Sequence, residues 1–375
     1  MAGDDDFNLT ENLLYAASRG RSYFQQVKDL VRYAFGSYKI SIRDYYYFAL
    51  FDSEMYTDEV RGEFVSDDYF GVVVVKTCDR EWWAISNDKV IAYTLLHGAG
   101  TPIPEPRGIY HPFRMCPGAK SLRSVEDVIA WLRDPETAYP MFGKPISGVQ
   151  SKGQAMILGA DLEADTLDLK GQEPMDITAF ATMVVNIQGT STHDGYLFQE
   201  VLKPHPDIVR MCGNRVSTVR VVVIIDEEGP KISHTTWKIG TGDNIADAFW
   251  REGNMVADID PMTGEIKRIV RGSGIDLEIV TKHPDTREVL LGQNLPDWQA
   301  MREMILRSAA LLPKVRFQGW DVSLCDRGPV VVEANTGSAF SLPQISSARG
   351  FMTPEFKRFV DRAAELTILE SKAEM

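Results

Sequence analysis

The chain has 375 residues, of which 44% are hydrophobic and 25% charged, and this balance is typical of a soluble globular protein with two or three packed lobes. Its formal net charge of −13 argues against a general affinity for nucleic acid or for anionic membrane, but it leaves room for a local basic cleft that binds phosphates. The cysteines are far apart and form no C-x-x-C pair, which argues against a disulfide framework and against a zinc site.

The beginning of the chain and its hydropathy predict a cytoplasmic protein. Residues 1–6 are acidic and lack the basic-then-apolar pattern of a signal peptide. No apolar run approaches the ~20 residues that a membrane span needs. Scattered, unpaired cysteines also fit a reducing compartment.

The first half of the chain is predicted to begin with helices and to continue with both helices and strands. Apolar residues recur at helical spacing through residues 10–51, with Thr10 as the expected N-cap. The aromatic run at residues 45–48 is expected to pack in a core or an interface. The other elements expected here are a strand at residues 72–76, helices at 121–132 and 176–187, and strands at 139–145, 153–159 and 196–202.

Strands dominate the second half, and the fold class is therefore α+β. A tight turn is expected at residues 260–264, where Asp-Pro and Gly occur together. The expected strands lie at residues 217–226, 232–239, 255–260 and 265–271, and the expected helices at 298–312 and 354–370.

Residues 142–153 place Lys144 at the end of a strand, before a small, polar loop and a second strand. A loop with few large side chains lets backbone N–H groups approach phosphate oxygens, and the lysine adds a fixed positive charge. No Gly-Lys-Ser/Thr sequence opens a helix here, so the segment is not a P-loop. Taken alone, the pattern also fits an ordinary turn between two strands.

Two further cations lie on strands that are otherwise apolar. Arg220 interrupts a valine-rich strand, and Lys238 follows Trp237 on the next one. Charged groups at such positions often mark a functional site. The alternative is that either side chain points to solvent from a half-exposed strand, and this alternative is stronger for Lys238.

Residues 319–335 carry the clearest chemical signal. Apolar β-forming residues flank an Asp-Arg-Gly turn, which predicts two antiparallel strands. If the loop is residues 326–328, Asp321 lies directly opposite Glu333, and Asn335 follows on the same face. Like charges ~4.5–5.5 Å apart destabilise a sheet unless a cation lies between them.

The oxygen ligands of this hairpin suit magnesium better than zinc, because two carboxylates and an amide occur without His or Cys. The alternative is an exposed hairpin with acidic residues on its wet face. Trp320 and the valines at 330–332 instead favour strands buried on both faces, where unpaired charge is costly. Magnesium is therefore the preferred interpretation.

The order of these motifs resembles the ATP-grasp superfamily, most closely its sugar-transfer-associated or glutamate-ligase-like branch. The resemblance covers roughly residues 85–350. The matching pieces are Asn87-Asp88-Lys89 followed by Gly100-Thr101-Pro102-Ile103-Pro104, Lys144-Pro145 with its loop, the strand at 196–202 and the hairpin.

The resemblance implies an ATP-grasp fold, in which two α+β lobes enclose ATP after a mainly helical N-terminal region. The implied segments are residues 1–85, helical and then with one or more strands; 86–138, the first part of the ATP-grasp region; 139–203, a small lobe with the phosphate loop; and 204–375, a large lobe with the magnesium site and a C-terminal helix.

The resemblance also implies roles for individual residues. Arg220 matches the family arginine near the γ-phosphate, and Lys238 is grouped with it as catalytic. Asp321, Glu333 and Asn335 match ligands of Mg²⁺, with Mn²⁺ as an alternative. The residues implied to bind ATP are Lys89, Lys144, Ser147, Gly148, Gln150, Ser151, Lys152, Gly153, Gln199, Glu200, Val201 and Leu202.

The implied activity is an ATP-dependent carboxylate–amine ligase that works through an acyl phosphate and releases ADP and phosphate. The expected partners are ATP, a small-molecule, sugar or peptide carboxylate and an amine acceptor, with no nucleic acid and no membrane span. Two alternatives stay open, namely a phosphotransferase on the same fold and a non-catalytic nucleotide-binding protein.

Overall fold

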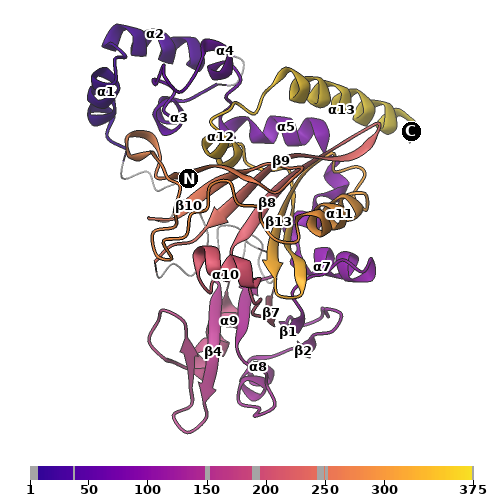
Figure 1. Cartoon of the computed structure of the whole chain (residues 1–375). Coiled ribbons are helices and arrows are strands. Elements are labelled where there is room, and N and C mark those ends of the chain that lie inside the picture. Colours follow the sequence, from indigo (N-terminus) through magenta and orange to yellow (C-terminus); the bar gives the residue numbers. More distant parts are fainter. Residues whose placement is uncertain are drawn as a thin grey trace. The chain divides into compact units, whose positions relative to one another are not determined.

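The computed structural model describes residues 7–36, 39–147, 153–187, 195–242, 249 and 252–373. These residues belong to two compact units, which Figure 1 shows in sequence colours. The large unit consists of Met1–Trp83, Pro204–Pro329 and Asn335–Met375, and the small unit of Ala84–Lys203 and Val330–Ala334. The division into four segments stays a prediction.

Short helices open the large unit. They are α1 (Leu9–Ser18), α2 (Tyr23–Ala34), α3 (Ile42–Tyr47) and α4 (Asp58–Arg61). The helical prediction for residues 10–51 is confirmed, although Ser22 and Ser41 each begin a new helix with a capping box. Thr10 is not the first cap, because Asn8 accepts the N–H of Glu11 and α1 begins one residue earlier than predicted.

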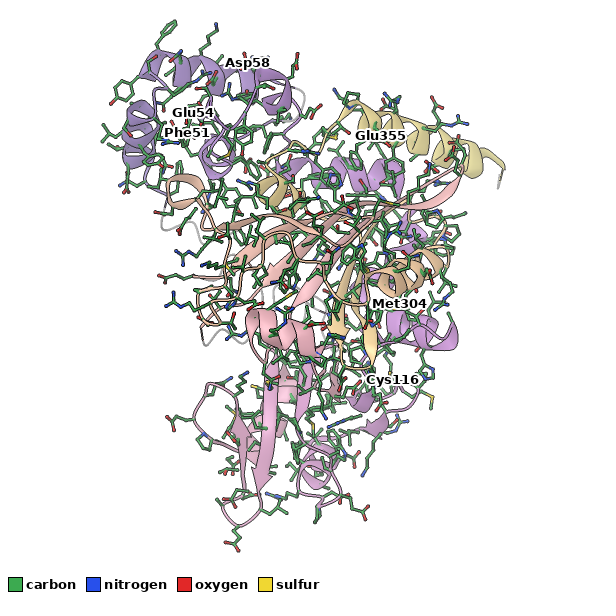
Figure 2. The ribbon with its side chains drawn as sticks, in the orientation of Figure 1. Phe51, Glu54, Asp58, Cys116, Met304 and Glu355 are labelled. Atoms are coloured by element: carbon green, nitrogen blue, oxygen red, sulfur yellow. The ribbon has the colours of Figure 1, made fainter. Side chains whose placement is uncertain are left out.

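The N-terminal helices enclose an aromatic core. Tyr45, Tyr46 and Phe48 are almost completely buried, which confirms core packing for this run. Figure 2 shows Phe51 within the same group of helices, while Glu54 and Asp58 have largely exposed side chains. Aromatic residues bury large apolar areas, so this cluster is a major source of stability for the region.

The predicted strand at residues 72–76 is wrong, because these residues lie in the helix α5 (Phe70–Thr77). Val73 and Val74 are buried, whereas Val72 and Val75 are exposed, and α5 packs against α13 (Pro354–Ala373). A short apolar run does not distinguish a buried strand from a helix that packs on one side. Tertiary packing has therefore overridden the β-propensity of valine here.

The main sheet of the large unit has the strand order β12-β11-β10-β9-β8-β13-β14. Helix α11 (Trp298–Ala309) packs on β9 and β13, and α12 (Ser341–Ser347) packs on β9, β10 and β11. The short α10 (Pro206–Cys212) precedes β8. The strands are β8 (Thr218–Asp226), β9 (Gly229–Ile239), β10 (Met255–Ile259), β11 (Ile266–Arg271), β12 (Glu278–Ile279), β13 (Phe317–Cys325) and β14 (Gly328–Thr336).

The sheet of the small unit has the order β2-β1-β7-β3-β4-β5-β6. In its core, the ring of Phe198 contacts the rings of Tyr196 and of Trp131 from the helix α8 (Val125–Leu132) edge to face. The elements are α6 (Ala84–Asn87), α7 (Lys89–Gly98), β1 (Pro106–Tyr110), β2 (Lys120–Leu122), α8 (Val125–Leu132), β3 (Met141–Pro145), β4 (Ala155–Asp161), β5 (Thr166–Leu169), β6 (Met175–Asp176), α9 (Ile177–Asn186) and β7 (Tyr196–Glu200).

The other strands and helices predicted from residue 121 onward are confirmed, with ends that differ by a few residues. The helix predicted at 121–132 is shorter than expected, because Ser124 caps α8 and the residues before it form β2. The tight turn at 260–264 is also confirmed, since the Asp260 carboxylate accepts the N–H groups of Met262 and Thr263.

The hairpin near the C-terminus is present, but its turn is shorter than predicted. Strand β13 ends at Cys325 and β14 begins at Gly328, so the connection is Asp326 and Arg327. Gly328 has φ +99°, which a residue with a side chain rarely adopts. The pairing of Asp321 with Glu333 depended on a three-residue loop and stays a prediction.

No helix in the described residues is long and apolar enough to cross a membrane.

Candidate functional site

The small unit holds one group of polar residues around Lys144. This lysine lies on β3 opposite Leu197 of β7, and Gln199 lies two residues further along β7, opposite Phe142. Because side chains alternate along a strand, Lys144 and Gln199 emerge from the same face of the sheet. Both are nearly buried, at 4% exposure each.

Tyr93 of α7 connects these two side chains. Its hydroxyl accepts a hydrogen bond from Lys144 Nζ at 3.0 Å and donates toward Gln199 Oε1 at 2.9 Å, with Val332 O at 3.3 Å as a second acceptor. The Lys144 ammonium also lies 5.2 Å from the centroid of the Tyr93 ring, within cation–π range. Tyr93 therefore fixes the direction of both Lys144 and Gln199.

Lys89 lies beside this group at the start of α7. Asp88 caps the helix by accepting the N–H groups of Val90 and Ile91, and its carboxylate also pairs with Arg114 at 2.6 Å. The Lys89 ammonium donates to Ile146 O at 3.4 Å and lies 3.8 Å from Glu333 Oε1. The small unit thus brings together Lys89, Lys144, Gln199 and Glu333, all of which the sequence predicted as site residues.

Burial changes the protonation of the two lysines. Loss of hydration lowers the pKa of Lys144 to about 8, and the Glu333 carboxylate opposes this shift. Burial also lowers the pKa of Lys89, with Glu333 opposing and the Lys144 charge adding to the decrease. Two cations held close together in a poorly hydrated place are an unfavourable arrangement that an anionic ligand such as phosphate would relieve.

The predicted phosphate loop is only partly described. Ser147 follows β3 and is nearly buried, and Gly153 precedes β4 with φ +72°. Gly148, Gln150, Ser151 and Lys152 lie outside the described residues. The backbone O of Gly153 accepts the hydroxyl of Tyr196 at 2.9 Å, which ties the end of the loop to β7.

The strand predicted to hold adenine is β7 with the residues that follow it. The Glu200 carboxylate accepts the N–H of Glu105 at 2.9 Å, and the Glu200 N–H donates to Glu105 O at 2.9 Å. Leu202 is nearly buried and Val201 is half-buried. Glu200 therefore anchors the strand, and a direct contact of residues 200–202 with a ligand stays a prediction.

The large unit holds a second group, in which Asp321 is bound by two cations. Asp321 of β13 lies directly opposite Arg220 of β8, and the guanidinium donates to both carboxylate oxygens, at 2.8 Å and 2.9 Å. The Lys238 ammonium, from β9, lies 3.2 Å from Oδ1. The structure therefore brings together Arg220, Lys238 and Asp321 and rejects the solvent-exposed alternative for Lys238, whose side chain is 11% exposed.

Electrostatics keeps Asp321 ionised. Burial alone would raise the pKa of Asp321, but the Arg220 guanidinium and the Lys238 ammonium hold it well below its usual range. A fork-shaped, two-bond contact between arginine and carboxylate also fixes both side chains in one geometry. Arg220 additionally donates to the Ser338 hydroxyl at 3.4 Å, which links β8 to the segment after β14.

The predicted metal ligands fit magnesium by chemical type. The Asp321 carboxylate uses about three of its four lone-pair sites for Arg220 and Lys238, so it retains room for a further partner. The side-chain Nδ2 of Asn335 is buried and has no hydrogen-bond partner among the described residues. No contact of that atom therefore fixes the amide in another orientation. Oxygen donors of this kind suit a hard cation.

Within the described residues, no group of three or more His, Cys, Asp or Glu side chains is arranged to hold a metal ion. Asp321 and Asn335 lie in the large unit and Glu333 in the small unit, so the three predicted ligands are compared with magnesium only by the chemical type of their oxygen donors. Magnesium usually shares its site with nucleotide phosphates.

Tyr93 and Ser338 were not predicted as site residues. Tyr93 lies four residues after Lys89 on α7, which places both on one face of the helix, so the spacing was a usable signal. The contact between Ser338 and Arg220 joins residues 118 positions apart, and no local pattern indicates it.

We expect Tyr93→Phe to lower the free energy of unfolding by about 1–3 kcal/mol, because Gln199 Oε1 loses its donor and Lys144 loses an acceptor in a buried place. Tyr196→Phe is the matched control, since among the described residues its hydroxyl donates one hydrogen bond, to a backbone carbonyl. Denaturant titration of both variants measures the difference. A smaller loss for Tyr93→Phe than for Tyr196→Phe would contradict the bridging role.

Comparison with solved structures gives only distant similarity. D-alanine-D-alanine ligase from Coxiella burnetii is 13% identical, with a TM-score of 0.45, over 79% of this chain and 62% of that one. Biotin carboxylase from Campylobacter jejuni is 9% identical, with a TM-score of 0.45, over 80% of this chain and 51% of that one. The chain thus spans between about half and two-thirds of the length of these proteins.

No protein of curated function matches the chain. The family model described as sugar-transfer associated ATP-grasp matches residues 74–358, which is most of the sequence and includes every predicted site residue from Lys89 to Asn335. The fold is accordingly that of ATP-grasp proteins, as the order of motifs predicted. The chain therefore belongs to the sugar-transfer associated ATP-grasp family.

Proposed function

We propose that the chain is an ATP-dependent carboxylate–amine ligase that acts through an acyl phosphate. The observation that supports this most strongly is the group of Lys89, Lys144 and Gln199 beside Glu333, within the range matched by the family model. Phosphoryl transfer depends mainly on positioning and on neutralising charge, and buried lysines supply both.

The proposed reaction has two steps. A carboxylate oxygen of the substrate attacks the γ-phosphorus, the bond from that phosphorus to the bridging oxygen breaks, and ADP leaves. The amine then attacks the acyl carbon, phosphate leaves with the former acyl oxygen, and the amine loses a proton. Water must be kept from the acyl phosphate, and the loop between Ser147 and Gly153 is the segment proposed to do this.

The residues around Lys144 and the residues around Asp321 have different proposed roles. Lys89 and Lys144 bind phosphate oxygens, with Ser147, Gly153 and the loop residues Gly148, Gln150, Ser151 and Lys152. Gln199, Glu200, Val201 and Leu202 form the adenine contact. Arg220 and Lys238 stabilise the charge on the transferred phosphoryl group.

Asp321, Glu333 and Asn335 would hold Mg²⁺ or Mn²⁺, which neutralises phosphate charge when it is bound. The pairing of Asp321 with Arg220 keeps its carboxylate ionised and holds it in one direction, which supports a role as a ligand. We place the reaction in the cytoplasm, with a sugar acid, amino acid or peptide as the carboxylate.

Product analysis tests the proposal. The enzyme is incubated with ATP, magnesium and pools of carboxylates and amines, and ADP, inorganic phosphate and organic phosphate are measured together. A ligase releases ADP and inorganic phosphate in equal amounts, and only when both a carboxylate and an amine are present. ADP with a stable phosphorylated product would instead assign a phosphotransferase, and no ADP from any pair would assign a non-catalytic nucleotide-binding protein.

A further inference from the structure

Helix α2 buries Gln26, Asp29 and Tyr33 and leaves several large apolar side chains exposed. Gln26 and Asp29 are buried, at 0% and 7% exposure, whereas Phe24 is 80% and Val31 is 54% exposed. Val27 is also exposed, and Phe35, just after the helix, is the most exposed of the set at 89%. Spacings of three, four and four residues place Phe24, Val27, Val31 and Phe35 on one side of the helix, and we call this set the α2 stripe.

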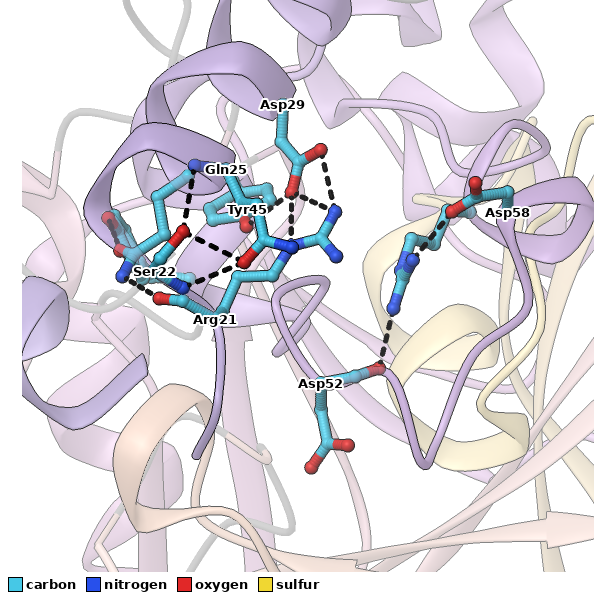
Figure 3. A network of polar contacts seen from close by, with 10 residues as sticks. Arg21, Ser22, Gln25, Asp29, Tyr45, Asp52 and Asp58 are labelled. Atoms are coloured by element: carbon cyan, nitrogen blue, oxygen red, sulfur yellow. Dashed lines mark hydrogen bonds and ion pairs between the residues drawn. The ribbon is translucent and has the colours of Figure 1, made fainter. Parts of the chain in front are cut away.

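Buried polar contacts hold the helix in this orientation. The Asp29 carboxylate accepts both donors of the Arg21 fork at 2.8 Å and the hydroxyl of Tyr45 at 2.9 Å, as Figure 3 shows. Gln26 accepts the Tyr46 hydroxyl at 2.8 Å and donates to Arg21 O at 2.7 Å. Rotating α2 to bury the stripe would leave these groups without partners in a buried place, which opposes the rotation.

The segment that carries the stripe is basic, although the whole chain is acidic. Residues 20–43 contain Arg21, Lys28, Arg32, Lys39 and Arg43 against a single acidic residue, Asp29, which is buried against Arg21. Lys28 and Arg32 are exposed and lie on one flank of the stripe, four residues apart. Charges more than ~8 Å away are largely screened at physiological salt, so the net charge of −13 does not prevent Lys28 and Arg32 from acting locally as cations.

An exposed stripe of phenylalanine and valine with lysine and arginine at its edge is the pattern of a helix that lies in the interface of an anionic bilayer. A second copy of the chain fits the stripe less well. Two-fold pairing of the stripe would bring Lys28 and Arg32 of both copies into one interface, where their like charges repel. We propose that α2 is a membrane-docking helix, with the α2 stripe among the lipids and Lys28 and Arg32 on anionic headgroups. This docking is independent of the proposed reaction.

Vesicle flotation with the full chain tests the proposal without ATP. We expect binding to vesicles of phosphatidylcholine mixed with phosphatidylglycerol, and at least about tenfold weaker binding to phosphatidylcholine alone. Lys28→Gln with Arg32→Gln should weaken binding to the anionic vesicles by about thirtyfold, because each basic residue near such a surface contributes roughly a factor of five. Val27→Ser with Val31→Ser should also reduce binding tenfold or more.

Matched controls change other exposed residues of the large unit. Lys76→Gln with Lys282→Gln removes two exposed charges, and Val289→Ser with Leu291→Ser removes two exposed apolar side chains. Both controls should bind anionic vesicles like the unaltered chain. Equal binding to neutral and anionic vesicles, or α2 variants that bind like their controls, would overturn the proposal. So would a dimer in sedimentation velocity that the Val27/Val31 variant abolishes while vesicle binding is absent.

Discussion

Asp321→Asn is expected to lower the free energy of unfolding by about 3–5 kcal/mol at neutral pH, because it leaves the Arg220 and Lys238 charges without their buried counter-charge. The loss should appear in denaturant titration as an earlier midpoint. The same change should lower the rate of ATP turnover by two orders of magnitude or more. The amide of asparagine cannot accept both donors of the Arg220 guanidinium, and it offers a cation no carboxylate.

Asp165→Asn is the matched control, because Arg133 binds both oxygens of Asp165 in the same fork, at 2.6 Å and 2.7 Å, on the surface of the small unit. Both side chains there are well exposed, so the change should have little effect on stability or on turnover. Equal losses for the two variants would show that geometry rather than burial decides the effect and would contradict the account of Asp321.

The contribution of Asp321 also has a defined pH range. Its pKa is lowered in the folded chain, so it stabilises the fold above the ordinary carboxyl range near pH 4 and loses this effect as the pH falls further. The difference in stability between the unaltered chain and Asp321→Asn should therefore shrink below about pH 4.

ATP affinity is expected to fall as the pH rises above about 8, because Lys144 then loses its charge in the free protein. A bound phosphate would hold the proton on Lys144, so affinity should decrease by up to about tenfold for each pH unit between the free and bound pKa values. Titration of ATP at pH 7, 8 and 9 in the presence of magnesium measures this.

Two variants test whether Lys144, rather than another titrating group, causes this pH dependence. Lys144→Arg keeps a charge at every accessible pH and should remove the pH dependence, whereas Lys144→Met should weaken ATP binding at least about tenfold already at pH 7. For folding the sign is reversed: the unfolded chain holds this proton more tightly, so stability should rise between about pH 8 and pH 10. ATP affinity that is constant to pH 10 in the unaltered chain would contradict this role for Lys144.

Much of the fold follows from local patterns in the sequence. The strands β8 to β11 combine β-branched residues with turn residues at their ends, and the helix α11 has a clear helical periodicity, so both were predicted. The strand predicted at residues 72–76 is wrong because a run of valines has no periodicity that distinguishes a strand from a helix. Packing against α13 favours the helix.

Some residues of the candidate site could be predicted because they are charged residues within otherwise apolar strands. Arg220 and Asp321 are charges in strands that are otherwise apolar, and the structure pairs them with each other. Their mutual contact was not predicted, because it depends on the register between β8 and β13, which are about a hundred residues apart in the sequence. Tyr93 was not predicted, although its spacing from Lys89 could have indicated it, because a tyrosine on an apolar helix is usually a core residue.

The most direct test of the proposed function is ADP release by the unaltered chain and by Glu333→Gln, with Asp165→Asn as the control. Glu333 lies beside Lys89 and is a proposed magnesium ligand, whereas Asp165 pairs with Arg133 on the surface of the small unit. We expect magnesium-dependent ADP release by the unaltered chain and the control, and a rate about a hundredfold or more lower for Glu333→Gln. Turnover of ATP by Glu333→Gln at the rate of the unaltered chain would contradict the proposed function.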